Sequence, residues 1–165
     1  RMLKAGEDPR FILRRLIRMA MEDIGLADPI ALLLATSARE AFDFLGVPEG
    51  LIALDEITVY LSLAPKSNSL EIAGMQADSL IERTGTLPVP RAFRNSVTQV
   101  GRALRYGENY KYDHDSPGAY SGQDHFPIQL RGTELYQPTL YGKEKALAER
   151  LQQLKARKAE IEKEH

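Results

Sequence analysis

The chain contains no cysteine among its 165 residues. Without thiols it cannot form disulfides, thiolate zinc sites, iron–sulfur clusters or a cysteine nucleophile, which fits a reducing compartment. It also lacks an apolar run of the roughly 18–20 residues that a membrane helix needs, and its N-terminus does not have the pattern of a signal peptide. The sequence therefore predicts a cytoplasmic protein with no membrane partner.

The common phosphate-binding and catalytic motifs are missing as well. Neither GxxxxGK[ST] nor GxGxxG occurs, so no glycine-rich turn is available to hold nucleotide phosphates. A serine or cysteine elbow, an HExxH helix and an EF-hand loop are likewise absent. We expect no catalytic residue, no cofactor and no metal in this chain, and no ATP hydrolysis by it alone. Because the first residue is Arg1 rather than methionine, we expect a segment of a longer protein.

Helical signals are present along most of the chain. Asp–Pro pairs at 8–9 and 28–29 are typical of helix starts, and apolar residues recur at spacings of three and four before a glycine or proline ends each run. The length and a net charge of −1 fit one globular domain. We predict an all-α fold, a single helical domain over 1–165, with six helices at about 9–24, 30–45, 48–64, 68–83, 95–106 and 143–164.

Two of these helices carry specific expectations about burial. The helix at 30–45 begins with the apolar residues Ile30, Leu32, Leu33 and Leu34, which predicts a place at the centre of the core. The helix at 95–106 is expected to turn Val97, Val100 and Leu104 inward. The last helix, at 143–165 with its tail, has apolar residues at the spacing of a short coiled-coil seam. We rank an intramolecular packing stripe as the first interpretation of these residues and a dimer zipper as the second.

Residues 107–142 have neither a helical nor a strand period and are rich in glycine and proline. Six of the seven tyrosines lie at or beyond position 106. Disordered segments are poor in aromatic residues, so we predict a long ordered loop at 107–142 that packs through its rings.

The nearest approach to a chemical cluster lies in this loop. Asp113, His114 and Asp115 are followed by Asp124 and His125, which together offer donors for a divalent metal or an acid–base pair. Their spacing matches no metal motif. The favoured interpretation is that the aspartates make turn hydrogen bonds before Pro117 and that His114 bonds within the loop.

Charge is distributed unevenly along the chain. Residues 83–111 contain six basic residues and one acidic residue, whereas residues 40–82 contain eight acidic residues and one lysine. Arginines beside tyrosines are suited to single-stranded DNA, with guanidinium groups on phosphates and rings on bases. The candidate DNA contacts are Arg91, Arg94, Arg102, Arg105, Lys111, Tyr106, Tyr110 and Tyr112.

A second interpretation of the basic stretch remains open. It can pair with the acidic stretch, in the same subunit or across an oligomer interface. A further group, Arg14, Arg15 and Arg18, is expected to be solvated helix surface, because these three residues do not all share one helix face.

Several stretches, taken in order, resemble one family. They are GEDPRFILRRL (6–16), EDIGLADP (22–29), YLSLAPKSNS (60–69), VPRAFRN (89–95), YGENYKYDHDSPGAY (106–120) and LRGTELYQP (130–138). They resemble the C-terminal region of the RarA family, also called MgsA, over about 6–150. These are AAA-type ATPases of replication and recombination, related to clamp-loader subunits and to the Werner helicase-interacting protein.

The resemblance implies a helical domain similar to the clamp-loader collar, which assembles the parent protein into a homotetramer. It also implies that the parent binds ATP and magnesium outside this chain, acts on DNA junctions, single-strand ends or gaps at stalled forks, associates with single-stranded DNA-binding protein, and is found with the nucleoid. We place the expected oligomer contact on the helix at 51–63 and the turn after it, through Leu51, Leu54, Tyr60, Leu63, Lys66 and Asn68. The leading hypothesis is an oligomerisation domain, and the alternative is a single-stranded DNA-binding module.

Overall fold

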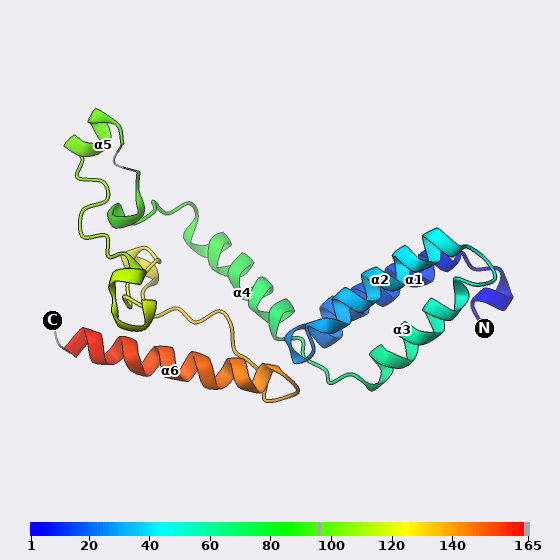
Figure 1. Cartoon of the computed structure of the whole chain (residues 1–165). Helices are drawn as coiled ribbons and strands as arrows, with labels where there is room; N and C mark the ends of the chain where they lie inside the picture. Colours follow the sequence, from blue (N-terminus) through cyan, green and yellow to red (C-terminus); the bar gives the residue numbers. More distant parts are fainter. Residues whose placement is uncertain (96, 164–165) are drawn as a thin grey trace. The chain divides into compact units, whose positions relative to one another are not determined.

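The computed structural model describes residues 1–95 and 97–163. Within these residues the chain is all-α, with no strand, which confirms the predicted fold class. Its α-helices are α1 (Pro9–Met19), α2 (Ile30–Leu45), α3 (Leu51–Leu63), α4 (Ser69–Thr84), α5 (Gln99–Ala103) and α6 (Glu144–Lys163) (Figure 1). No helix among the described residues has the length and apolarity to cross a membrane.

The contacts divide the chain into two compact units. Unit 1 combines Arg1–Gln76 with Tyr136–Glu149, and unit 2 combines Ala77–Leu135 with the segment from Arg150 onward. Each unit is therefore built from two stretches that are distant in sequence. The prediction of a single domain over 1–165 stays a prediction, and the units are described separately.

Helix α1 begins where the Asp–Pro pair predicts. The Asp8 carboxylate accepts a hydrogen bond from the backbone N–H of Arg10 at 2.8 Å, and Pro9 occupies the first helical position. The run continues through a π-helical segment, Ala20–Ile24, and ends at Gly25, whose positive φ of 50° suits glycine. The predicted helix at 9–24 is confirmed, with a change of winding in its last part.

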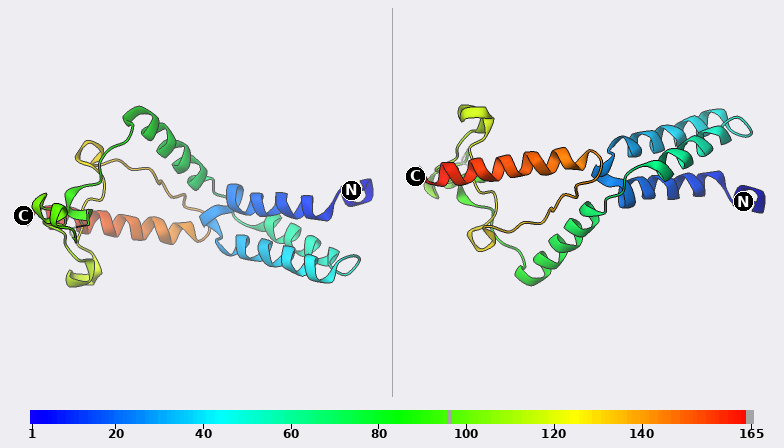
Figure 2. Two further views of the ribbon diagram at one scale, coloured as in Figure 1. Left: turned by 90° about the horizontal axis from the view of Figure 1, so that it is seen from above. Right: turned by 90° about the horizontal axis from the view of Figure 1, so that it is seen from below.

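Helices α1, α2 and α3 lie side by side in unit 1, as the views in Figure 1 and Figure 2 agree. Their buried core is formed by Leu13, Ala20, Ile24, Ala31, Ala35, Phe42, Leu54, Ile57 and Leu61. Burial of a leucine, isoleucine or phenylalanine side chain contributes roughly 1.5–3 kcal/mol, and that of an alanine methyl less. These three helices form the three-helix bundle of unit 1.

The bounds of α2 are confirmed, and the helix packs into the core, but mostly through residues other than the four apolar ones at its start. Its inward face consists of Ala31, Ala35 and Phe42, whereas Ile30, Leu32 and Leu33 are exposed and only Leu34 is partly buried. Small residues let neighbouring helix backbones approach closely, so the alanines face the core and three of the four large side chains are left outside.

Helix α3 begins three residues after Pro48, because Pro48, Glu49 and Gly50 form a turn first. The N–H of Gly50 donates to the carbonyl of Gly46 at 2.7 Å. The helix ends at Leu63, before Pro65 as predicted. Helix α4 begins at Ser69, after Asn68, and runs to Thr84, which confirms the fourth predicted helix within one residue at each end.

The fifth predicted helix, 95–106, is wrong in length and in orientation. Only Gln99–Ala103 is helical, because the Thr98 hydroxyl caps the helix by accepting from the N–H of Gly101 at 3.0 Å, and Arg105 takes a positive φ of 55°. Val97, Val100 and Leu104 are exposed rather than inward. Ser96 lies outside the described residues.

In unit 2, residues 107–135 of the predicted loop form short 3-10 turns and contact the last helix through polar side chains. The Asp124 carboxylate forms ion pairs with Lys158 of α6 and with Arg131. Leu151, Leu154 and Ile161 of the predicted seam are partly buried. This supports the intramolecular interpretation of the seam. The last residue of the predicted helix, Glu164, lies outside the described residues.

We predict that replacing Gly142 with alanine destabilises unit 1 by more than the same change at Gly6. Both glycines have a positive φ, 53° and 90°, so alanine is strained by about 1–2 kcal/mol at either position. At Gly142 a Cβ atom would in addition lie 2.1 Å from the carbonyl of Ala27 and 2.6 Å from Pro65, whereas at Gly6 it meets nothing within 4 Å. Urea unfolding of both variants measures the difference, and equal losses would contradict the steric argument.

Candidate interaction surfaces

A buried carboxylate joins two helix starts in unit 1. Glu144, the first residue of α6, is completely buried. Its Oε1 accepts from the hydroxyls of Ser69 at 2.5 Å and Tyr136 at 2.7 Å, and its Oε2 accepts from Thr139 at 2.5 Å. Ser67 donates in turn to the Ser69 hydroxyl at 3.1 Å. These hydroxyls replace the water that the carboxylate loses, which is the condition for burying it.

The hydroxyl donors also control the ionisation of this group. Burial disfavours the charged form of Glu144, but the surrounding hydroxyls of Ser67, Ser69, Thr139 and Tyr136 outweigh this and lower the pKa to about 2. Burial and the bond to the carboxylate raise the pKa of Tyr136 to about 12. Glu144 is thus ionised and Tyr136 neutral at physiological pH. The sequence analysis missed Glu144, because its partners come from 67–69 and 136–139.

Asp28 lies at the start of α2, where a backbone hydrogen bond from Ile30 helps to lower the pKa of its carboxyl, and its side chain also contacts the region around Glu144. Its Oδ2 accepts from the Tyr60 hydroxyl at 2.5 Å, and its Oδ1 lies 3.4 Å from Nζ of Lys143. Backbone bonds complete the connection: the N–H of Ser67 donates to the carbonyl of Asp23, and that of Lys143 donates to the carbonyl of Ala27, both at 2.8 Å. We call this region the junction, comprising residues 23–28, 60–69 and 136–144.

The candidate oligomer residues divide into structural and exposed ones. Leu54 is a core residue at 2% exposure, and Leu51 and Tyr60 are partly buried. Lys66 donates to the carbonyls of Leu61 and Ala64 at the end of α3. Leu63 is 81% exposed, and Lys66 and Asn68 are exposed beside it.

The outward side of α3 also carries residues that the sequence analysis did not single out. Ile52 is 71% exposed and Val59 is 59% exposed. With Leu63 they recur at spacings of seven and four, so the three side chains share one helix face. That spacing was the available signal. We call Ile52, Asp55, Glu56, Val59 and Leu63 the outer face of α3.

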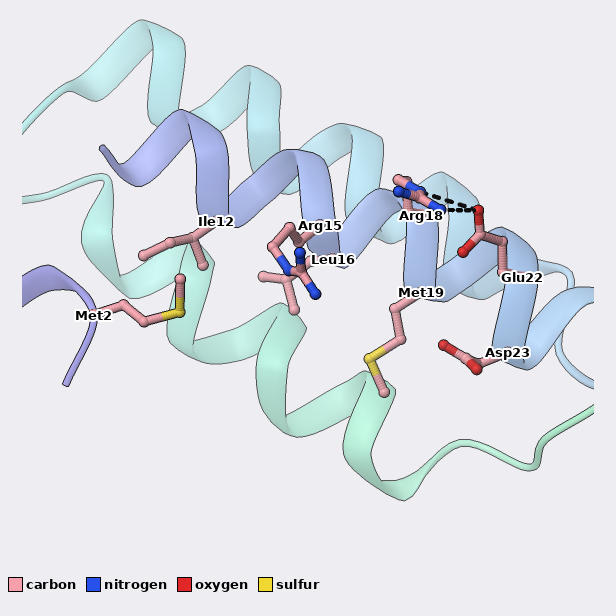
Figure 3. Close-up of a pocket in the computed structure, with 8 residues that line it drawn as sticks. All are labelled: Met2, Ile12, Arg15, Leu16, Arg18, Met19, Glu22 and Asp23. Carbon is pink, nitrogen blue, oxygen red and sulfur yellow. Dashed lines mark hydrogen bonds and ion pairs between the residues drawn. The ribbon is translucent and has the colours of Figure 1, made fainter. Parts of the chain in front are cut away.

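Two hollows flank α1. The first, of about 350 Å³, is drawn in Figure 3. Its apolar side chains include Ile12, Leu16 and Met19, and its polar rim includes Arg18, whose Nη2 lies 2.7 Å from Glu22. It is lined by Met2, Ile12, Arg15, Leu16, Arg18, Met19, Glu22 and Asp23.

The second hollow, of about 430 Å³, is lined only by α1, the residue Met21 that follows it and α2. We call it the arginine hollow, and its residues are Arg10, Arg14, Ile17, Arg18, Met21, Arg39 and Asp43. The prediction that Arg14, Arg15 and Arg18 do not all share one face agrees with the two hollows, since Arg15 lines the first, Arg14 the second and Arg18 both. The sequence analysis missed that Arg10, Arg14 and Arg18, at spacings of four, share one side of α1.

In unit 2, the candidate DNA residues gather around an aromatic cluster. Phe93 stacks on His125 with ring centroids 4.5 Å apart and meets Tyr110 edge to face at 5.9 Å. The guanidinium of Arg94 lies over the Tyr106 ring at 5.1 Å, and its Nε donates to the carbonyl of Val89 at 2.6 Å. Arg94 and Tyr106 are therefore engaged within the unit.

The remaining DNA candidates present their side chains outward. Tyr110 and Tyr112 are about half exposed, and the exposed basic residues are Arg91, Arg102, Arg105 and Lys111. Among these, Arg105 has an ion-pair partner, Glu108, at 3.5 Å. Among the described residues of 91–112, the contact between a candidate cation and a candidate tyrosine is that of Arg94 with Tyr106.

Asp113 makes hydrogen bonds within the loop, but to Ser121, eight residues further on, rather than in a turn before Pro117. Its Oδ1 accepts from the N–H and the hydroxyl of Ser121 at 2.9 and 2.6 Å, and these bonds lower the pKa of Asp113. His114 tilts against Tyr112, and His125 stacks on Phe93. In the part of the chain that the structure describes, no three His, Asp or Glu side chains gather as a metal site.

The family model described as MgsA AAA+ ATPase C terminal matches residues 1–155. The chain belongs to this family and is the C-terminal region of a RarA-type AAA+ ATPase.

Named relatives of this chain support the same family assignment. Replication-associated recombination protein A of Coxiella burnetii is 43% identical over 92% of this chain, that of Haemophilus influenzae 40% over 94%, and that of Escherichia coli 37% over 92%. The chain spans about a third of the length of these relatives, 35%, 35% and 34% respectively.

We predict that Glu144→Gln removes a pH dependence of stability. The folded pKa of about 2 lies below the ordinary value of 4.5, so ionised Glu144 stabilises the fold above pH 4.5, and this contribution is lost as the pH falls towards 2. The shift corresponds to about 3 kcal/mol. Thermal unfolding between pH 2 and pH 7 measures the wild type and the variant, and the difference between them should shrink towards pH 2. A difference independent of pH would contradict the assignment.

Proposed function

We propose that this chain is the self-association domain of its parent ATPase and holds four copies together. The observation that carries the proposal is the outer face of α3, where Leu63, Ile52 and Val59 are exposed on one side of a helix. Exposed apolar surface of this kind on a helical bundle is typical of protein–protein contacts. Phe44, 90% exposed near the end of α2, adds to it.

Under this proposal the chain itself catalyses nothing. The parent would bind ATP and Mg²⁺ in a core outside this chain, and association would hold four such cores close enough to act on one DNA junction. DNA and single-stranded DNA-binding protein are then partners of the whole protein. The family membership and the relatives named replication-associated recombination protein A support this setting.

The solution mass of the chain tests the proposal. We expect light scattering to give about four times the chain mass of 18.5 kDa, stable on dilution in moderate salt. Leu63→Glu places a charge on the outer face of α3 and should lower the mass towards 18.5 kDa. The matched control is Ile128→Glu, which changes an exposed residue of unit 2 and should leave the mass unchanged. A wild-type monomer at all concentrations would overturn the proposal.

A second function, single-stranded DNA binding, is favoured by the exposed rings of Tyr110 and Tyr112 beside Arg91, Arg102, Arg105 and Lys111. Base stacking on such rings contributes about 1–3 kcal/mol per base, and the cations would neutralise phosphates. We propose it as the alternative if the chain is monomeric.

The salt dependence of binding tests this alternative. If both arginines contact phosphates, Arg102→Glu with Arg105→Glu should weaken binding of a labelled oligothymidine and reduce the slope of log K against log salt by about 1.4, at about 0.7 per contact on a single strand. The control Arg83→Glu lies at the end of α4, outside the candidate contacts, and should change the slope little. Fluorescence anisotropy at several salt concentrations provides the measurement. Equal slopes for both variants would contradict the assigned contacts.

A further inference from the structure

The arginine hollow and the outer face of α3 are complementary surfaces that the bundle leaves unfilled. We infer that copies of this chain associate head to tail, with the outer face of α3 of one copy lying in the arginine hollow of the next. This inference rests on the proposed self-association and names the two surfaces that would form it.

The arginine hollow is lined by more basic than acidic residues, together with two apolar side chains. Arg10, Arg14 and Arg18 follow one another at about 6 Å along α1, and α2 adds Arg39. The apolar part of the lining consists of Ile17 and Met21.

Within the chain these guanidinium groups are only partly neutralised. Asp43 pairs with Arg10 at 2.9 Å and with Arg39 at 3.1 Å, and Glu22 pairs with Arg18 at 2.7 Å. Arg14 has no ion pair with any residue that the structure describes. Four guanidinium groups therefore face two carboxylates.

The outer face of α3 has the opposite charge and a similar apolar centre. Asp55 and Glu56 are the only charged residues of α3, and both are exposed. Neither is paired with a cation among residues 1–95 and 97–163. They flank the stripe of Ile52, Val59 and Leu63, which lies away from the buried Leu54, Ile57 and Leu61.

The two surfaces therefore match in shape, polarity and charge. A helix is convex and the hollow is concave, as in packing of a helix against a groove between two others. The apolar stripe would cover Ile17 and Met21, while the two unpaired carboxylates would meet the two guanidinium charges in excess. Opposite charges brought together in a partly desolvated contact also fix its orientation.

We infer a heterologous contact, in which each copy gives its outer face to one neighbour and receives the outer face of another in its hollow. One copy presents α3, and the next presents α1, Met21 and α2. Each copy thus keeps one surface of each kind available, and repeated contacts close into a ring if the rotation per copy allows it. A closed ring of any size, four included, would use every hollow and every outer face.

Charge reversal with complementation tests the pairing. The first variant, Arg14→Glu with Arg18→Glu, makes the hollow acidic and leaves α3 unchanged. The second, Asp55→Lys with Glu56→Lys, makes the outer face basic and leaves the hollow unchanged. Each alone opposes like charges and should give a mass near 18.5 kDa. An equal mixture, and a chain carrying all four substitutions, should recover the wild-type mass.

Matched controls use the same charge changes on the same bundle. Arg15→Glu changes α1 outside the hollow, and Glu40→Lys changes an exposed residue of α2, so both should keep the wild-type mass. Thermal unfolding by circular dichroism verifies that each variant is folded.

The outcomes separate this inference from the function on which it rests. A monomeric wild type overturns the self-association. An oligomeric wild type whose mass survives either reversal, or folded variants whose mixture stays monomeric, overturns the head-to-tail pairing and leaves self-association standing. Recovery in the mixture supports the pairing, because only opposite surfaces on two different chains can produce it.

Discussion

Unit 1 depends on one buried negative charge. Glu144 is completely enclosed, and an ionised carboxylate without partners would be excluded from such a site. Three hydroxyls donate to it directly, and these come from the start of α4 and from the segment before α6. A single carboxylate therefore positions the first residues of two helices. The backbone bond from Ser67 to Asp23 then connects this arrangement to the three-helix bundle.

The features that could be predicted from the sequence are those decided by neighbouring residues. Asp8 with Pro9 marks the start of α1, Pro65 limits α3, and Gly46 follows the last residue of α2. Each acts within about one helical turn, through a cap or through a restricted backbone.

The predictions are wrong or incomplete where a segment's packing, or the length of a helix, depends on residues that its own hydrophobic pattern does not reveal. Helix α2 turns its alanines inward because of what packs against it, which its own hydrophobicity cannot indicate. The Thr98 cap limits α5 to one short segment. From the sequence alone, Glu144 is indistinguishable from the other charged residues of an exposed helix. Its burial follows from the hydroxyls of Ser69, Tyr136 and Thr139, and only the fold brings these together.

The junction also implies an order of events during synthesis. The core contacts of the three-helix bundle lie between Leu13 and Leu61 and can form once these residues have left the ribosome. Ser69 must wait for Glu144, which is 75 residues further along the chain. At about 5–20 residues per second this interval lasts roughly 4–15 s. During that time the bundle is complete while Ser67 and Ser69 are still hydrated, so a nascent chain carries its α1, α2 and α3 surfaces before its last helix is in place.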